Sequence, residues 1–225
     1  MNTEVDSELV RRAAVHAALG EPARLRIVDT LRTGDASPSE LAGMLAMPSN
    51  LLAHHLKTLE AAGVVTRHRS EGDGRRTYLT LAASPDDPAA TVVGSPPGRV
   101  VFVCTANSAR SHLAAALWRR ASAVPTASAG THPADRIAPG ALAAAARHDL
   151  DLPEVAPRHL DEVSAAGDLV VTVCDRAHEE LGTSGDVHWS VPDPVRPGTA
   201  RAFDAAYDDL ARRVGELTRR VSPTA

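Results

Sequence analysis

Cysteine is scarce in this sequence, which has only Cys104 and Cys174 among its 225 residues. Two cysteines without the spacing of a disulfide framework favour a reducing compartment, where a reactive thiol stays free. The sequence also lacks an apolar run of transmembrane length and a signal peptide. We therefore expect a cytoplasmic protein with no membrane partner, and the composition argues against a secreted, disulfide-stapled domain.

Lysine is scarcer still, since Lys57 is the only one, and the formal net charge is −4. A chain with this charge is not a general polyanion binder, so any contact with nucleic acid must come from a local basic patch. Its length allows two domains of ordinary size. A stretch rich in proline, glycine and small residues at 84–98 predicts a linker. We accordingly place one domain at 7–83 and another at 99–222.

The most informative segment is an apolar, β-branched run that ends at Cys104 and continues as Thr-Ala-Asn-Ser-Ala-Arg110-Ser111 into an alanine-rich stretch. The order of strand, loop and helix predicts that backbone N–H groups and a helix N-terminus converge on one anion site. That field favours the thiolate form of Cys104, which is the nucleophilic form. The predicted oxyanion-binding residues are Thr105, Ala106, Asn107, Ser108, Ala109 and Arg110.

Two side chains of this segment complete the predicted site. Arg110 can grip two oxygens of the anion with its planar fork, and Ser111 can donate a hydrogen bond to the Cys104 sulfur. The alternative is a buried structural cysteine with Arg110 as a surface charge. Farther along, Asp193 in the segment Ser-Val-Pro-Asp193-Pro is a candidate general acid, although an Asp-Pro pair is also common in turns.

The first domain is predicted to be a winged helix-turn-helix. The pattern indicates helices over 9–19, from Pro22, over 37–47 and over 49–63, followed by a hairpin with strands at 64–69 and 75–81. The runs Ala18-Leu-Gly-Glu-Pro-Ala-Arg-Leu-Arg-Ile-Val28 and His54-His-Leu-Lys-Thr-Leu-Glu-Ala-Ala-Gly-Val-Val65 carry a resemblance to the ArsR family of repressors.

That resemblance implies a homodimer whose fourth helix enters the major groove of a double-stranded DNA operator. By position, the residues that could face bases are Ser49, Asn50, Ala53 and His54. Those that could face phosphates are Lys57, Arg67, Arg69, Arg75 and Arg76. The domain has no cysteine, which excludes a tri-cysteine arsenite sensor within it, and the C-terminal dimerisation helix of the family is not evident.

The second domain is predicted to be a three-layer α/β fold with a parallel sheet. The expected strands are 99–104, 126–129, 168–174 and 187–189, and the expected helices lie near 111–123, 139–148, 158–166, 176–181 and 201–220. The reactive loop then sits at the carboxyl end of the first strand, where such folds bind ligands. His132, His159, His178 and His188 have no metal-ligand spacing, so we expect no metal site and assign them surface or packing roles. Adjacent His54 and His55 point apart on a helix and cannot easily chelate one ion.

These residues resemble the low-molecular-weight tyrosine phosphatase superfamily, and more its arsenate reductase branch. Val195-Arg-Pro-Gly stands where phosphatases usually have aromatic residues, and Asp168-Leu-Val-Val-Thr-Val-Cys174 resembles the reductase segment with the second redox cysteine. The resemblance implies that Cys104 attacks arsenate and that Cys174 then forms a disulfide with it. Alternatively, Cys174 is a small apolar residue at a strand end.

The predicted function is therefore a transcriptional regulator fused to a thiol-dependent arsenate reductase. Thioredoxin-coupled reductases carry a third cysteine where this chain has Leu181. Either the Cys104–Cys174 disulfide is therefore reduced directly, or a small thiol resolves the adduct. The reductant is open: thioredoxin, or mycothiol with a mycoredoxin. We expect no bound cofactor. Two other readings remain: a low-molecular-weight protein phosphatase that acts on phosphate esters, and a DNA-binding regulator whose second domain is a non-catalytic oxyanion or redox sensor.

Overall fold

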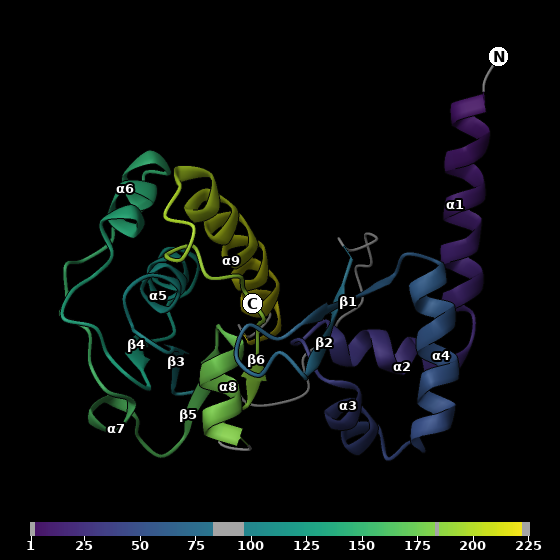
Figure 1. Ribbon diagram of the computed structural model, residues 1–225, viewed down its shortest axis with the longest axis horizontal. Helices are drawn as coiled ribbons and strands as arrows, with labels where there is room; N and C mark the ends of the chain where they lie inside the picture. Colours follow the sequence, from purple (N-terminus) through teal and green to yellow (C-terminus); the bar gives the residue numbers. More distant parts are fainter. Residues whose placement is uncertain (1–2, 83–96, 183–184, 222–225) are drawn as a thin grey trace. The chain divides into compact units, whose positions relative to one another are not determined.

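A computed structural model describes residues 3–82, 97–182 and 185–221 of the chain (Figure 1). Most of the predicted linker, 84–98, lies outside these residues. The chain divides into two compact units, one made of residues up to 69 together with 75–90, the other of 70–74 together with 91–225. None of the helices in the described ranges has the length and apolar character that a bilayer crossing requires.

The first unit is a helix-turn-helix with a β-hairpin, as predicted. Its helices are α1 (Thr3–Leu19), α2 (Pro22–Leu31), α3 (Pro38–Leu45) and α4 (Ser49–Ala61). A capping box starts α3, because the Ser37 side chain accepts from the Glu40 N–H while the Glu40 side chain accepts from the Ser37 N–H. Ala46 ends this helix in a left-handed conformation with φ 49°, which makes the tight turn into α4.

The hairpin of the first unit pairs β1 (Val65–Arg69) with β2 (Thr77–Leu81) in antiparallel register. A bridge between Ala36 and Leu79 ties β2 to the segment before α3. The core of this unit is a single cluster of aliphatic side chains, which includes Ile27, Leu41 and Leu56. Burial of these residues holds the helices against the hairpin.

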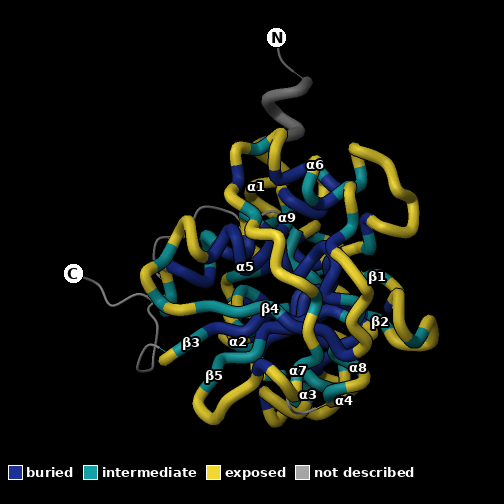
Figure 2. Tube along the Cα trace, turned by 90° about the vertical axis from the view of Figure 1, so that its left-hand side faces the viewer, coloured by how far each residue is buried: buried dark blue, intermediate teal, exposed yellow. Residues whose placement is uncertain are grey.

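The second unit is built on a four-stranded parallel sheet in the order β4-β3-β5-β6. The strands are β3 (Arg99–Cys104), β4 (Thr126–Gly130), β5 (Asp168–Thr172) and β6 (Val187–His188). From its second residue onward, β3 is buried, and the centre of this unit is dark blue in Figure 2. Strands covered on both faces read as continuous apolar runs, which is why Val100–Val103 show no alternation.

Helices cover both faces of this sheet, which confirms the predicted three-layer α/β architecture. They are α5 (Arg110–Ala121), α6 (Pro139–Arg147), α7 (Leu160–Val163), α8 (Asp175–Leu181) and α9 (Ala200–Val221). Figure 1 shows α5, α6 and α9 on one side of the sheet and α8 on the other. The expected helix over 158–166 was too long: only the four residues of α7 are helical, and His159 and Ser164 on either side of it have extended backbone.

Candidate active site

The loop between β3 and α5 has its carbonyl groups turned to one side. The carbonyls of Cys104, Thr105, Ala106 and Ser108 accept hydrogen bonds from the N–H groups of Thr131, His132, Ala134 and Ala138, respectively. In a planar trans peptide the C=O and the following N–H point in opposite directions. The N–H group in each of these four peptide planes therefore points away from the 131–138 segment. An anion cradle requires this arrangement.

The Cys104 sulfur lies at the floor of this loop. Ser111 Oγ is 3.1 Å from Cys104 Sγ, and Asn107 Nδ2 donates to the same Ser111 Oγ at 2.9 Å. Because Ser111 Oγ is the acceptor in its hydrogen bond with Asn107, the hydroxyl hydrogen of Ser111 is available to donate to the sulfur. The predicted hydrogen bond between Ser111 and Cys104 is present.

Asn107 also takes the strained position of the loop. Its φ is 45°, whereas Ala106 is not among the residues with positive φ. Asparagine tolerates this left-handed conformation better than alanine does. The Asn107 Oδ1 in addition accepts from the Arg158 N–H at 2.9 Å. Asn107 thus holds the loop through both ends of its side-chain amide. Because the positive φ falls on Asn107 and not on Ala106, position 106 does not need the backbone conformational freedom of glycine.

Gly130, at the end of β4, is a site residue that the sequence analysis missed. A Cβ atom at this position would lie 2.6 Å from the Thr105 carbonyl oxygen and 2.9 Å from the Asn107 nitrogen. Real Cβ atoms do not approach so closely, so the loop can pass over β4 only because residue 130 has no side chain. A glycine after an alanine-rich strand gave no signal in the sequence, because the loop that covers it comes from 25 residues earlier.

Arg110 is the cation of the site. It is 9% exposed, its Nη1 donates to the Val191 carbonyl at 2.8 Å, and its Nη2 lies 3.5 Å from Asp193 Oδ1. Burial opposes its charge, but the negative forms of Cys174 and Cys104 and the Asp193 carboxylate outweigh that effect and raise the pKa of Arg110. Arg110 thus keeps its charge although it is buried, which suits an oxyanion-binding role.

Cys174 lies beside the reactive loop although 70 residues separate it from Cys104. It follows β5, which is the direct neighbour of β3, and its Sγ is 3.4 Å from Thr105 Oγ1. Both cysteines are free and line the same pocket as Ala106, Ser108 and Arg110. Burial raises the pKa of the Cys174 thiol, and the Arg110 charge opposes that rise.

Asp193 also lines this pocket, and its carboxylate faces Arg110 from the segment that follows β6. The predicted general acid is therefore close to the predicted nucleophile.

His188 was assigned a surface or packing role, but it is part of a buried polar cluster. Its Nε2 lies 3.2 Å from Asp175 Oδ1, and both side chains are at most 3% exposed. Asp175 directly follows Cys174, and the sequence analysis did not single it out.

On the first unit, the residues predicted to face DNA lie on the exposed surface. The predicted base contacts Ser49, Asn50, Ala53 and His54 and the predicted phosphate contact Lys57 are exposed on α4, whereas Leu52, His55, Leu56 and Leu59 of the same helix are buried. Arg67, Arg69, Arg75 and Arg76 of the hairpin are exposed too. Arg67 contacts Glu60 at 2.9 Å, and Arg76 lies 4.0 Å from Glu40.

The two adjacent histidines on α4 face different surroundings. His54 is exposed, while His55 is buried with its Nδ1 3.5 Å from Glu21 Oε2. Over the described ranges of the chain, no group of three or more His, Cys, Asp or Glu side chains is arranged to hold a metal ion.

Comparison with known proteins matches two separate parts of the chain to different families. Residues 99–224 match the model of the low molecular weight phosphotyrosine protein phosphatases, and residues 19–68 match a helix-turn-helix domain model. The chain is 45% identical over 65 residues to the HTH-type transcriptional repressor SmtB of Mycobacterium tuberculosis. That match covers 29% of this chain and 46% of SmtB, so the chain spans about half the length of this curated relative.

Solved structures resemble the second unit. The tyrosine phosphatase AmsI of Erwinia amylovora has a TM-score of 0.51 at 20% identity, with 58% of this chain and 97% of AmsI covered. A YwlE mutant from Bacillus subtilis has a TM-score of 0.50 at 21% identity, with 56% of this chain and 99% of YwlE covered. At this identity the likeness shows a shared fold. The predicted resemblances of the two parts, to ArsR-type repressors and to the phosphatase superfamily, are confirmed.

Proposed function

This chain belongs to the low molecular weight phosphotyrosine protein phosphatase family, and on that premise we propose that its second unit reduces arsenate with the thiols of Cys104 and Cys174. The first unit, in this proposal, binds an operator in double-stranded DNA as a transcriptional regulator. The observation that carries the reductase activity is the position of Cys174 against Thr105 of the reactive loop. Hydrolysis of a phosphate ester needs one thiol, whereas reduction by two electrons needs a second.

In the first step, the Cys104 thiolate attacks the arsenic(V) of arsenate, which Arg110 and the loop N–H groups hold. A sulfur–arsenic bond forms, and one oxygen leaves as water after Asp193 gives it a proton. In the second step, the Cys174 thiolate attacks the Cys104 sulfur. The sulfur–arsenic bond breaks, its electron pair stays on arsenic, arsenite leaves, and a Cys104–Cys174 disulfide remains.

The disulfide must then be reduced from outside, because the chain contains no third cysteine. Position 181, where a third redox cysteine would shuttle the disulfide, is a leucine. We therefore propose an external thiol reductant, thioredoxin or mycothiol with a mycoredoxin, as the electron donor, and no bound cofactor. Arg110 has a further part in this scheme, since its charge favours the thiolate form that buried Cys174 must reach before it can attack.

The test measures arsenite release from arsenate in the presence of each thiol reductant. Wild-type protein should release arsenite repeatedly, and Cys104→Ser should release none. Cys174→Ser should form at most one arsenate adduct per chain and then stop. Mass spectrometry after arsenate exposure should detect the Cys104–Cys174 disulfide in the wild type. Absence of turnover with every thiol system, while Cys104 is reduced, would refute the reductase proposal.

A phosphatase is the second candidate, and the match of residues 99–224 to the phosphatase family model supports it. In this proposal Asp193, which lines the same pocket as Cys104 and Arg110, protonates the leaving oxygen of a phosphate ester. The two activities separate on one variant, Cys174→Ser. Hydrolysis of an aryl phosphate should survive this change if the protein is a phosphatase, whereas arsenate turnover should be lost if it is a reductase. Asp193→Ala should slow whichever of the two reactions occurs, because both use Asp193 as the proton donor.

For the first unit, we propose a homodimer whose α4 helices contact the major groove. Support comes from the likeness to the SmtB repressor and from the exposed row on α4 that includes Lys57, the predicted phosphate contact. Lys57→Ala should weaken operator binding and lower the salt dependence by about one counterion per contact. The matched control is Arg12→Ala, which changes an exposed cation on α1 instead. An unchanged salt slope would exclude Lys57 from the interface.

A third arrangement combines both units without turnover, with the second unit as a sensor of oxyanions or oxidants. It would require that the ligand have different affinities for two states of the protein. Operator affinity measured with and without arsenate, arsenite, phosphate and peroxide distinguishes this case. Identical affinity under all four additions would eliminate it.

A further inference from the structure

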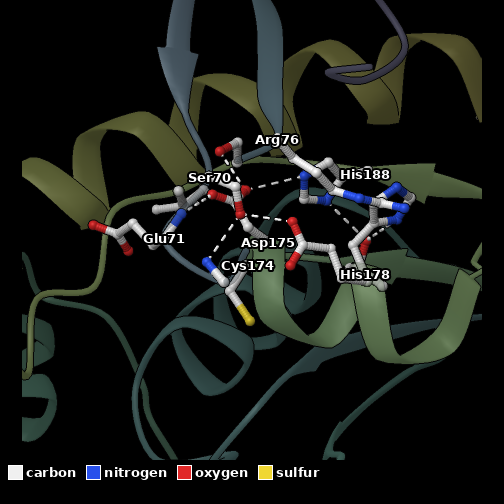
Figure 3. Close-up of polar contacts among 12 residues, drawn as sticks. Ser70, Glu71, Arg76, Cys174, Asp175, His178 and His188 are labelled. Atoms are coloured by element: carbon white, nitrogen blue, oxygen red, sulfur yellow. Dashed lines mark hydrogen bonds and ion pairs between the residues drawn. The ribbon is translucent and has the colours of Figure 1, made fainter. Parts of the chain in front are cut away.

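A buried carboxylate directly follows the second cysteine of the site. Asp175 is the first residue of α8 and only 3% exposed. Its Oδ1 accepts a hydrogen bond from Ser190 Oγ and lies 3.2 Å from His188 Nε2 (Figure 3). Burial on its own raises the pKa of Asp175, but the hydrogen bonds from His188 and Ser190 outweigh this effect and lower it. The Glu71 N–H donates to its Oδ2 at 2.8 Å as well, so the group is an ionised acceptor held by three donors.

The imidazole of His188 is fixed from three directions. Its Nε2 faces Asp175, its Nδ1 lies 3.0 Å from Thr172 Oγ1, and the ring of His178 stacks on it at a centroid distance of 4.0 Å and an angle of 10°. Thr172 belongs to β5 and His178 to α8. In Figure 3 the Cys174 sulfur points away from the two imidazole rings. The two imidazoles therefore lie away from the Cys174 sulfur, whereas Asp175 itself lines the same pocket as Cys174.

The same carboxylate reaches the other half of the site through Ser190. The next residue, Val191, accepts the Arg110 Nη1 hydrogen bond at 2.8 Å, and Asp193 follows two positions later, 3.5 Å from Arg110 Nη2. One buried group thus connects the start of α8, which carries Cys174, with the segment that carries the candidate acid. A misplacement of a reacting group by about 1 Å costs on the order of a hundredfold in rate.

We propose that Asp175 is a positioning residue, which acts through His188 and Ser190 to hold Cys174 and Asp193 in place around Arg110. The inference concerns the second thiol and the acid, and it rests on the proposed function where the reaction is arsenate reduction. Asp175 lines the pocket, but Ser190 and His188 occupy its Oδ1 and the Glu71 N–H occupies its Oδ2, so we assign it no contact with the anion. The oxyanion cradle of residues 104–110 is held separately, by the carbonyl hydrogen bonds to 131–138 and by Asn107.

The test compares Asp175→Asn with Asp168→Asn. Both substitutions remove one carboxylate charge, and the Asp168 side chain is only 6% exposed, in an ion pair with Arg99 at the opposite end of β5. Alkylation of Cys104 gives the number of intact sites in each preparation, so that rates are expressed per site. We expect Asp175→Asn to lower kcat about tenfold or more while the KM for arsenate changes less than about threefold. Asp168→Asn should keep the wild-type kcat per site.

A second readout needs no turnover: the rate at which a small thiosulfonate modifies Cys174, followed by mass spectrometry. We expect a several-fold change in Asp175→Asn and none in Asp168→Asn. Ser190→Ala, which keeps the pair of Asp175 and His188, should slow aryl phosphate hydrolysis through Asp193 without changing Cys174 modification. This variant keeps the inference testable if Asp175→Asn does not fold.

The outcomes separate the inference from the proposed function. If wild-type protein reduces no arsenate, the proposed function fails, and the inference is judged on Cys174 modification and aryl phosphate hydrolysis. If wild-type protein reduces arsenate but Asp175→Asn matches Asp168→Asn per site in every assay, the function stands and the inference is overturned. A loss that appears only as fewer intact sites, with normal kcat per site, also overturns it, because that result reports a purely structural role.

Discussion

The buried imidazole of His112 makes the second unit sensitive to mild acid. His112 lies on α5 directly after Ser111, is 5% exposed, and its Nε2 has no hydrogen-bond partner among the described residues. Burial lowers its pKa to about 4 from an ordinary value of 6.5. The unfolded chain therefore takes up a proton at this residue between those two values while the folded protein does not, so stability falls as pH drops through this window.

The magnitude follows from the size of the shift. A pKa shift of one unit corresponds to about 1.4 kcal/mol, so the full loss below pH 4 is on the order of 3 kcal/mol, with about 2 kcal/mol already lost at about pH 5. Replacement by glutamine, His112→Gln, keeps a polar side chain but removes the titrating group. The difference in unfolding free energy between about pH 7.5 and about pH 5 should then shrink by about 2 kcal/mol relative to wild type.

Urea unfolding followed by tryptophan fluorescence is the suitable assay. Both tryptophans, Trp118 and Trp189, are buried in the second unit, so the signal reports this unit and not the helix-turn-helix. His132→Gln is the matched control, because it removes an imidazole that is 63% exposed, and its pH dependence should follow the wild type. If His112→Gln loses as much stability in acid as wild type does, the assignment of this loss to His112 is wrong.

Two further substitutions test the packing around the site. Gly130→Ala should abolish anion binding and turnover, because the new Cβ would lie 2.6 Å from the Thr105 carbonyl oxygen. The control Gly215→Ala on α9 should leave both unchanged, because a Cβ there meets nothing within 4 Å. Calorimetry measures the anion binding, and a normal affinity in Gly130→Ala would contradict the tight contact. Asp168→Asn should cost on the order of 2 kcal/mol in urea unfolding at neutral pH, because the Arg99 hydrogen bond lowers the pKa of Asp168 and stabilises the folded state above the unfolded pKa. This contribution should disappear as pH falls through the folded pKa, and a wild-type midpoint for the variant at neutral pH would refute it.

The reactive loop could be predicted from sequence because its parts are contiguous. Cys104, Arg110 and Ser111 lie within one strand–loop–helix unit, so their proximity follows from local structure alone. The exposed face of α4 could be predicted for the same reason, since helical periodicity separates its buried leucines from the polar residues between them. The extent of α7 was less accessible, because four residues are too few to give a periodic signal.

The remainder of the site depends on strand order. Cys174 and Asp193 reach Arg110 because β5 pairs with β3 and β6 pairs with β5, which brings the carboxyl ends of three strands together. The roles of His188 and Asp175 depend on the same pairing, since the pair joins residues 13 positions apart across β6 and α8. Nothing in the local sequence around either residue indicates that the two are in contact.

The sequence by itself determined which chemistry this protein can carry: a thiol, a guanidinium and a helix N-terminus in one loop, and a separate helix-turn-helix. These features are encoded locally, by apolar periodicity, capping and the conformational preferences of short segments. The tertiary structure alone decided that a second thiol lies 3.4 Å from the Thr105 hydroxyl and that a carboxylate faces Arg110. The physical reason is that sheet order, set by burial of β3 between two neighbouring strands, brings together residues that no local pattern connects.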